Sequence, residues 1–147
     1  DLWINEEVEF SGEFHNVSGA GLNPLPVQRP IPMWVGGRAK PSQAVVERIG
    51  QISNGWFVLC GPNEIEEIRA KIATEAKKVG RSVVEIGEEA GVAVVGEREH
   101  EWKNRVKEWK KIGLSHLCLR TLGGGLKVSQ HVKKLQEVIK ELPETLA

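Results

Sequence analysis

Two kinds of apolar pattern alternate along the chain, short apolar runs and longer stretches with helical spacing. Apolar residues three or four positions apart form one stripe on a helix. This spacing predicts helices within residues 42–49, 65–79, 102–112 and 132–142. Short apolar runs before and between these stretches are typical of strands. The predicted strands are Pro30–Gly37, Trp56–Cys60, Gly91–Val95 and Leu114–Leu119.

The first predicted strand is bounded by prolines and glycines. Pro30–Gly37 has prolines at its entry, a short apolar run and two glycines at its end. A run this short and apolar is typical of a strand buried on both faces. Glycines at its C-terminal end allow a sharp turn and a close approach to the backbone amides.

One helix ending recurs three times in the sequence. A basic residue, a β-branched residue and a glycine stand at Arg48–Gly50, Lys78–Gly80 and Lys111–Gly113. We expect each glycine to adopt the left-handed conformation that ends a helix. The spacings of 30 and 33 residues match the ~30 residues or more of a strand–helix unit.

The N-terminal residues have a different pattern. Val8–Phe10 and Phe14–Val17 alternate apolar and polar residues around a connection that contains glycine, which predicts a β-hairpin. A linker rich in glycine and proline follows. We therefore divide the chain into a hairpin and proline-rich linker over residues 1–29 and four strand–helix units over residues 30–147.

Strands that alternate with helices indicate an α/β fold with a parallel sheet and right-handed crossovers. Four such units are half of a (β/α)8 TIM barrel, which typically takes about 250 residues. The alternative is a small open α/β sheet. In both architectures ligands bind beyond the C-terminal ends of the strands.

The composition excludes several classes of function. The chain has 147 residues, with 20 basic and 20 acidic side chains, so its net charge favours neither nucleic acid nor an anionic membrane. No stretch approaches the ~20 apolar residues of a membrane span. Cys60 and Cys118 lie within apolar runs, which indicates buried thiols in a reducing compartment, and we expect a cytoplasmic protein. Because the chain begins with Asp1 and not Met, we expect further sequence upstream.

Four strand ends are candidate binding positions. Gly36–Arg38 is placed to hold an anion with backbone amides and one guanidinium, although an ordinary turn would use the same glycines. Arg120–Gly125 also follows a strand and precedes a helix, and it is either a phosphate loop or a flexible connection. The other two strand ends are Cys60–Asn63 and Gly96–Arg98.

Other kinds of chemistry find little support. The four histidines lack the spacing of metal ligands, so we expect no metal. His116 alternates with leucines on a strand and faces either the barrel interior or the helix layer. The cysteines have no strand-end histidine that would activate a thiol. The catalytic residues are unknown at this stage.

The sequence resembles the luciferase-like monooxygenase family, most closely the branch that uses a deazaflavin coenzyme. Asn23–Gly37 is similar to the signature run of that family, and Glu9–His15 is similar to the hairpin before it. Asn54–Trp56 resembles the family's Asp-Gly-Trp turn, with Asn in place of Asp. Gly113–Leu117 and Arg120–Leu126 resemble its final strand and loop.

The resemblance implies the C-terminal half of a (β/α)8 flavin- or deazaflavin-dependent oxidoreductase. The implied cofactor is 8-hydroxy-5-deazaflavin (coenzyme F420) or FMN. Gly36, Gly37 and Arg38 would hold its phosphate, and Gly55 and Trp56 would belong to the same site. Two hypotheses stay open. The chain is either part of an oxidoreductase that needs the first half, or a free-standing half-barrel that binds a cofactor or forms a homodimer without catalysis.

Overall fold

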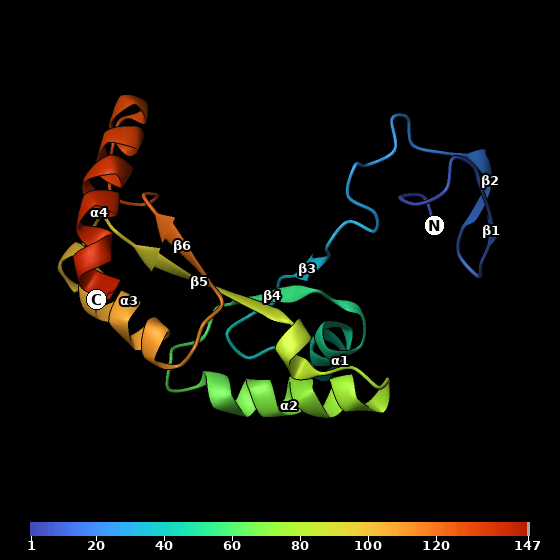
Figure 1. Ribbon diagram of the computed structural model, residues 1–147, viewed down its shortest axis with the longest axis horizontal. Helices are drawn as coiled ribbons and strands as arrows, with labels where there is room; N and C mark the ends of the chain where they lie inside the picture. Colours follow the sequence, from blue (N-terminus) through green and yellow to red (C-terminus); the bar gives the residue numbers. More distant parts are fainter. Residues whose placement is uncertain (147) are drawn as a thin grey trace. The chain divides into compact units, whose positions relative to one another are not determined.

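The computed structural model describes residues 1–146 and divides the chain into two units, Asp1–Met33 and the part from Trp34 onward. In the first unit, β1 (Val8–Ser11) pairs with β2 (Asn16–Ala20) in an antiparallel hairpin (Figure 1). The predicted hairpin is confirmed. Its second strand starts at Asn16 and not at Phe14 as expected; Phe14 lies in the connection, with 81% of its surface exposed.

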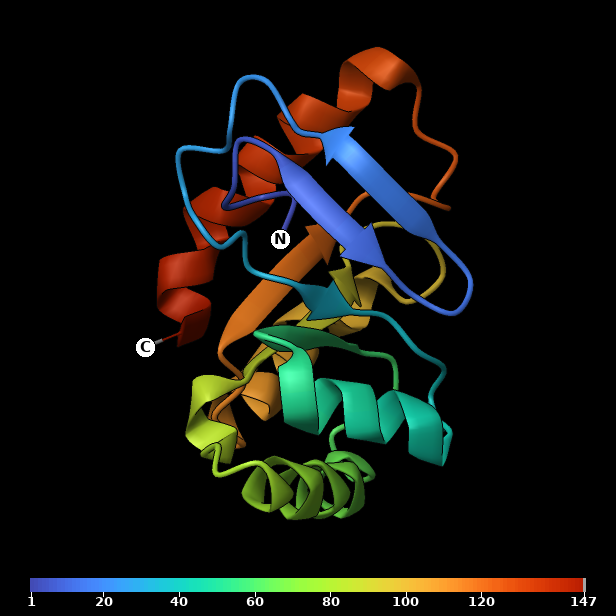
Figure 2. The same ribbon diagram turned by 90° about the vertical axis from the view of Figure 1, so that its right-hand side faces the viewer.

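The second unit is a four-stranded parallel sheet with four helices (Figures 1 and 2). Its strands lie in the order β3-β4-β5-β6, which is also their order along the chain. The strands are β3 (Trp34–Val35), β4 (Gly55–Val58), β5 (Gly87–Ala93) and β6 (His116–Arg120). The helices are α1 (Gln43–Ile52), α2 (Ile65–Lys78), α3 (Trp102–Lys111) and α4 (His131–Leu146). Short 3-10 turns at Val83–Glu85, Glu99–Glu101 and Val128–Gln130 complete the connections.

The predicted fold class is confirmed: four βα units with parallel strands follow an N-terminal β-hairpin. Sequential strand order is the order of a (β/α)8 barrel, whereas a doubly wound sheet reverses its order at one point. The expectation that Pro30–Gly37 forms a strand buried on both faces is wrong. Only Trp34–Val35 pairs, at the edge of the sheet and half-buried, because Pro30 and Pro32 lack the N–H groups of a ladder.

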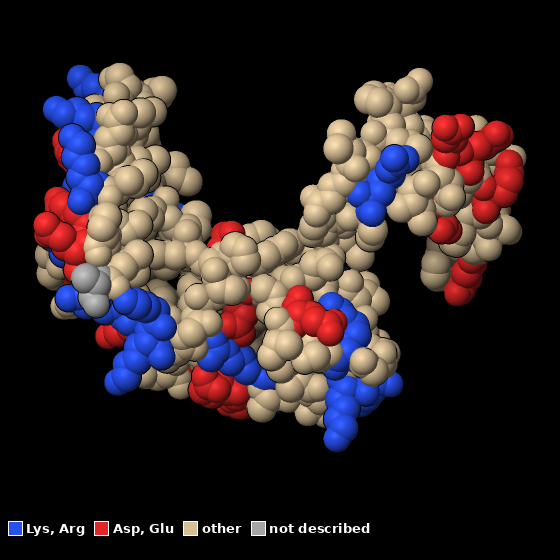
Figure 3. All heavy atoms as spheres, in the orientation of Figure 1, with Lys and Arg blue, Asp and Glu red and all other residues tan. Residues whose placement is uncertain are grey.

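The helices cover one face of the sheet. Alternate residues of each strand point to this face and form the core with the apolar sides of the helices. The strand residues of this core are Val35, Trp56, Val58, Ala90, Val92, Leu117 and Leu119. Figure 3 shows Lys and Arg side chains gathered over α3 and α4, on their outer sides. No helix among the described residues is long and apolar enough to cross a bilayer.

Two of the three predicted helix endings are confirmed. Gly80 and Gly113 have φ angles of 73° and 74° and follow α2 and α3. Gly50 is different, since it lies inside α1 and is buried. A Cβ at Gly50 would lie 2.6 Å from Glu75 Cβ and 2.8 Å from Ala76 N on α2. This glycine therefore allows two helices to pack closely and does not end one.

One charged side chain of the sheet faces the helices. Glu88 on β5 accepts hydrogen bonds from Arg69 on α2, at 2.9 Å from Nε and 2.5 Å from Nη2. Arg69 Nη1 also donates to the Ile112 carbonyl at the end of α3. The hydrogen bond to Glu88 raises the pKa of Arg69, so this guanidinium stays charged. The pair fastens α2 to β5 and to the α3–β6 connection.

Candidate functional site

The loop from β3 to α1 leaves the C-terminal end of the sheet, where ligands of parallel barrels bind. Gly36 and Gly37 begin this loop, and neither has a positive φ. A Cβ at Gly36 would have Phe57 Cδ2 as its nearest neighbour, 4.0 Å away, and one at Gly37 would lie 3.4 Å from Val45 Cγ1. Contacts with the described residues therefore do not require glycine here. A close approach from outside the chain remains a physical reason for two glycines.

The same loop leads into the N-terminal end of α1. Ser42 is the N-cap, and its side chain makes no capping hydrogen bond. The first turn of α1 has no acidic side chain, so the positive end of the helix dipole is not compensated there. Arg38 is exposed in the loop. These features are favourable for an anion close to Gly36 and Gly37.

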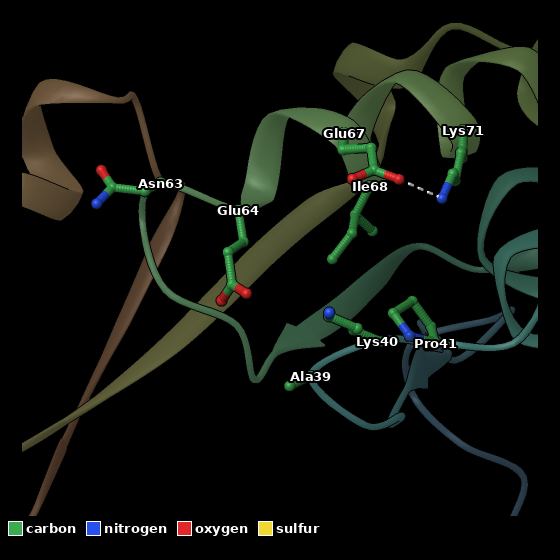
Figure 4. A pocket seen from close by; sticks show the side chains of 8 residues that line it. All are labelled: Ala39, Lys40, Pro41, Asn63, Glu64, Glu67, Ile68 and Lys71. Atoms are coloured by element: carbon green, nitrogen blue, oxygen red, sulfur yellow. Dashed lines mark hydrogen bonds and ion pairs between the residues drawn. The ribbon is translucent and has the colours of Figure 1, made fainter.

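A cavity of about 320 Å³ lies beside this loop (Figure 4). Its walls come from the loop after β3, the connection after β4 and the first turns of α2. The lining residues are Ala39, Lys40, Pro41, Asn63, Glu64, Glu67, Ile68 and Lys71. Lys71 Nζ lies 2.6 Å from Glu67 Oε1, and its hydrogen bond lowers the pKa of Glu67. Glu64 accepts a hydrogen bond from the Gly61 amide at 3.1 Å, so both carboxylates of the cavity already have partners.

Gly55 and Trp56 lie at the other end of β4. Gly55 is buried under the indole of Trp34, where a Cβ would lie 2.5 Å from Trp34 Cδ2. Trp56 is 3% exposed and packs in the core between the sheet and the helices. The Trp56 ring therefore lies on the opposite face of the sheet from Trp34 and Phe57, which contact each other. In this chain both residues support the sheet from within.

Trp34 spans the face of the sheet that the helices leave open. Its indole lies over Gly55 on β4 and over Gly87 on β5, where a Cβ would approach Trp34 Cη2 to 2.7 Å. On β6 it meets His116 edge to face, with ring centroids 5.0 Å apart. Phe57 packs against it at 5.8 Å. One side chain from the edge strand therefore crosses the whole sheet near the N-terminal ends of its strands.

The open face also carries side chains that the sequence analysis did not select as site residues. They alternate with the helix-facing residues along β5 and β6, and this alternation is the signal that could have found them. They are Glu89 and Cys118; Arg120, which the sequence analysis placed in a candidate loop, lies on the same face as the last residue of β6. His116, whose direction the sequence left open, lies on this same face against Trp34.

The strand ends after β4 and after β6 have structural explanations. Cys60 is buried, and this burial raises the pKa of its thiol, which keeps it protonated. In the loop after β6, a Cβ at Gly124 would lie 2.5 Å from Val95 Cβ, and Gly123 and Gly125 have positive φ angles. Sterics within the chain therefore account for these glycines. Within residues 1–146 no cluster of three or more His, Cys, Asp or Glu side chains is arranged to hold a metal ion.

Comparison with known proteins identifies the family of the chain. The family model described as luciferase-like monooxygenase matches residues 1–137. The chain belongs to the luciferase-like monooxygenase family. No curated protein matches it.

Two solved structures share the fold. One is an F420-dependent secondary alcohol dehydrogenase in complex with an F420–acetone adduct, with a TM-score of 0.70 and 13% identity. The other is a coenzyme F420-dependent tetrahydromethanopterin reductase from Methanopyrus kandleri, with a TM-score of 0.72 and 18% identity. The alignments cover 99% and 98% of this chain but only 58% and 60% of those chains. The chain therefore spans about three fifths of their length.

The contact of Trp34 with Gly87 predicts a specific coupling between the two positions. Gly87→Ala places a methyl group into the indole, and we expect it to lower the free energy of unfolding by about 1–3 kcal/mol. In a Trp34→Leu background the same change should cost much less, because the obstructing ring is absent. Urea unfolding of the four variants gives the coupling energy. An equal cost of Gly87→Ala in both backgrounds would contradict the placement of the ring.

Proposed function

We propose that this chain is the C-terminal portion of a luciferase-like oxidoreductase that uses F420 or a flavin, and that it contributes the site for the cofactor phosphate. Gly36, Gly37 and Arg38 would hold the phosphate. The observation that carries the proposal is the pair of glycines that no contact with the described residues requires, at the C-terminal end of β3. The N-terminal end of α1, without a side-chain cap or an acidic first turn, supports it.

In this proposal the backbone amides of Gly36 and Gly37 donate to phosphate oxygens, and Arg38 adds a positive charge. Gly55 and Trp56, which the resemblance assigns to the same site, would contribute by holding β4 beside β3. When bound, the cofactor supplies hydride-transfer chemistry. F420 is favoured over FMN because both structural neighbours are F420-dependent enzymes. The free thiols Cys60 and Cys118 fit the reducing conditions of the cytoplasm.

Titration of the chain with F420 and with FMN tests the phosphate site. Gly37→Val brings a branched side chain to the proposed phosphate position, and we expect the dissociation constant to rise about tenfold or more. This magnitude follows because a charge-assisted hydrogen bond contributes about 1.5–3 kcal/mol, and about 1.4 kcal/mol is a factor of ten.

Gly61→Val is the matched control for this titration. Gly61 follows β4, has no positive φ, and a Cβ there would meet only Glu64 Oε2 at 3.7 Å. This variant should bind like the wild type. Equal affinities of Gly37→Val and the wild type would remove Gly36–Arg38 from the cofactor site.

We infer a second property, association through the open face of the sheet. Phe57 and Leu59 are 39% and 55% exposed there, and no strand of the described residues pairs with the outer edge of β6. On α4, Val132 and Ile139 are also exposed, at 65% and 56%. Exposed apolar surface and free strand edges of this kind favour a covering partner. The partner would be the remaining part of the barrel or, in a binding module without catalysis, a second copy of the chain.

Sedimentation of the isolated chain tests this second property. We expect it to self-associate at micromolar concentration, and the double substitution Phe57→Ser/Leu59→Ser should shift it towards monomer. Val84→Ser is the matched control, because Val84 is 87% exposed but lies in the turn before β5, away from the open face. A wild-type chain that stays monomeric at micromolar concentration would contradict association through the open face.

A further inference from the structure

Glu75 is a buried carboxylate between two helices. It lies on α2 and is 3% exposed. Both of its oxygens accept hydrogen bonds from α1, Oε1 from Gln43 Nε2 at 2.9 Å and Oε2 from Gln51 Nε2 at 3.2 Å. Lys78 on α2 donates to Oε1 at 2.7 Å, and this hydrogen bond lowers the pKa of Glu75, so the carboxylate stays charged at neutral pH. A buried charge is costly unless it is paired and hydrogen-bonded, and these three donors meet both needs.

The two glutamines belong to opposite ends of α1. Gln43 is the first residue of this helix and Gln51 is the last but one. Figure 2 shows α1 and α2 side by side. Gly50 allows the close approach, because a Cβ there would lie 2.6 Å from Glu75 Cβ. One carboxylate on α2 therefore holds both ends of α1.

The C-terminal end of α1 has additional support. Arg81 donates from Nη1 to the Gly50 carbonyl at 3.1 Å and from Nη2 to the Ser53 carbonyl at 2.6 Å. Ser53 Oγ also donates to the Ile49 carbonyl at 2.8 Å. Loss of the Gln51 hydrogen bond would therefore leave this end of the helix held in place.

The N-terminal end of α1 has less support. The side chain of Ser42 makes no capping hydrogen bond. Within residues 1–146, the hydrogen bond from Gln43 to Glu75 is the one that ties a side chain of the first turn to another element. The same turn adjoins the β3–α1 loop, since a Cβ at Gly37 would lie 3.4 Å from Val45 Cγ1. The position of the first turn beside Gly37 therefore depends on Glu75.

We propose that Glu75 is a positioning residue for the phosphate site, and that through Gln43 it holds the N-terminal end of α1 beside Gly36 and Gly37. This inference rests on the proposed function. An anion at a helix N-terminus is bound by backbone N–H groups, and the position of the first turn sets where these groups point. Glu75 acts through Gln43 and is not itself a ligand of the phosphate.

Two matched substitutions separate positioning from stability. Gln43→Met and Gln51→Met each keep the length of the side chain and remove one donor to Glu75. Urea unfolding gives the stability that each variant has lost. Hydrogen exchange of the Val45 amide, which donates to the Ser42 carbonyl in the first turn, reports the order of that turn without any ligand. We expect this exchange to be faster in Gln43→Met and unchanged in Gln51→Met.

Titration with F420 and with FMN then measures the effect on the phosphate site. We expect the dissociation constant to rise about three- to tenfold in Gln43→Met, and to stay at the wild-type value in Gln51→Met. Glu75→Met removes the acceptor itself and should weaken binding as Gln43→Met does, with circular dichroism to check its folding. The two glutamine variants keep the test decisive if Glu75→Met does not fold.

Gly37→Val distinguishes a failure of this inference from a failure of the proposed function. If Gly37→Val weakens binding and Gln43→Met does not, the role of Glu75 is overturned and the phosphate site stands. Equal effects of Gln43→Met and Gln51→Met on exchange and affinity would overturn that role as well. If Gly37→Val binds like the wild type, the phosphate site is overturned, and the role of Glu75 with it.

Discussion

The arrangement of the sheet depends on one contact, the indole of Trp34 lying across two glycines. Trp34 comes from a strand of only two residues at the edge of the sheet, which makes few ladder hydrogen bonds. Its ring compensates by covering Gly55 and Gly87 and by reaching His116 on the far strand. A tryptophan buries a large apolar area, so a single side chain fastens the edge strand to the other three. Any side chain at either glycine would occupy the space of the ring.

The two faces of the sheet differ in what covers them, and the two ends of the open face differ as well. The helix face is a conventional apolar core, with Glu88 neutralised by Arg69. The open face is filled by Trp34 only near the N-terminal ends of the strands. The glycines of the β3–α1 loop lie at the other end, where the strands have their C-terminal residues. Trp34 therefore stabilises the sheet at the end opposite to the proposed phosphate site, an arrangement usual in parallel barrels.

Much of the architecture could be predicted from the sequence, because local signals decide it. Alternating strand and helix patterns gave the parallel order, and the glycines at positions 80 and 113 marked helix ends. The prediction that Gly50 ends a helix was wrong, because this glycine is needed for close contact with α2, more than twenty residues away in the chain. The sequence also did not show which face of the sheet carries the Trp56 side chain, because a continuous apolar run has no alternation that separates helix-facing residues from the others. The position of the Arg120 side chain over Gly91 depends on how β5 and β6 align side by side, and no local sequence pattern reveals that alignment.

The central claim, that Trp34 crosses the open face, can be observed directly by NMR. Nuclear Overhauser effects from the Trp34 ring protons to the Hα protons of Gly55 and Gly87, together with effects to the His116 ring, are the predicted result. These protons come from four different strands, so no local conformation of one segment brings them together. A Trp34 ring that shows contacts only to its sequence neighbours would contradict the account.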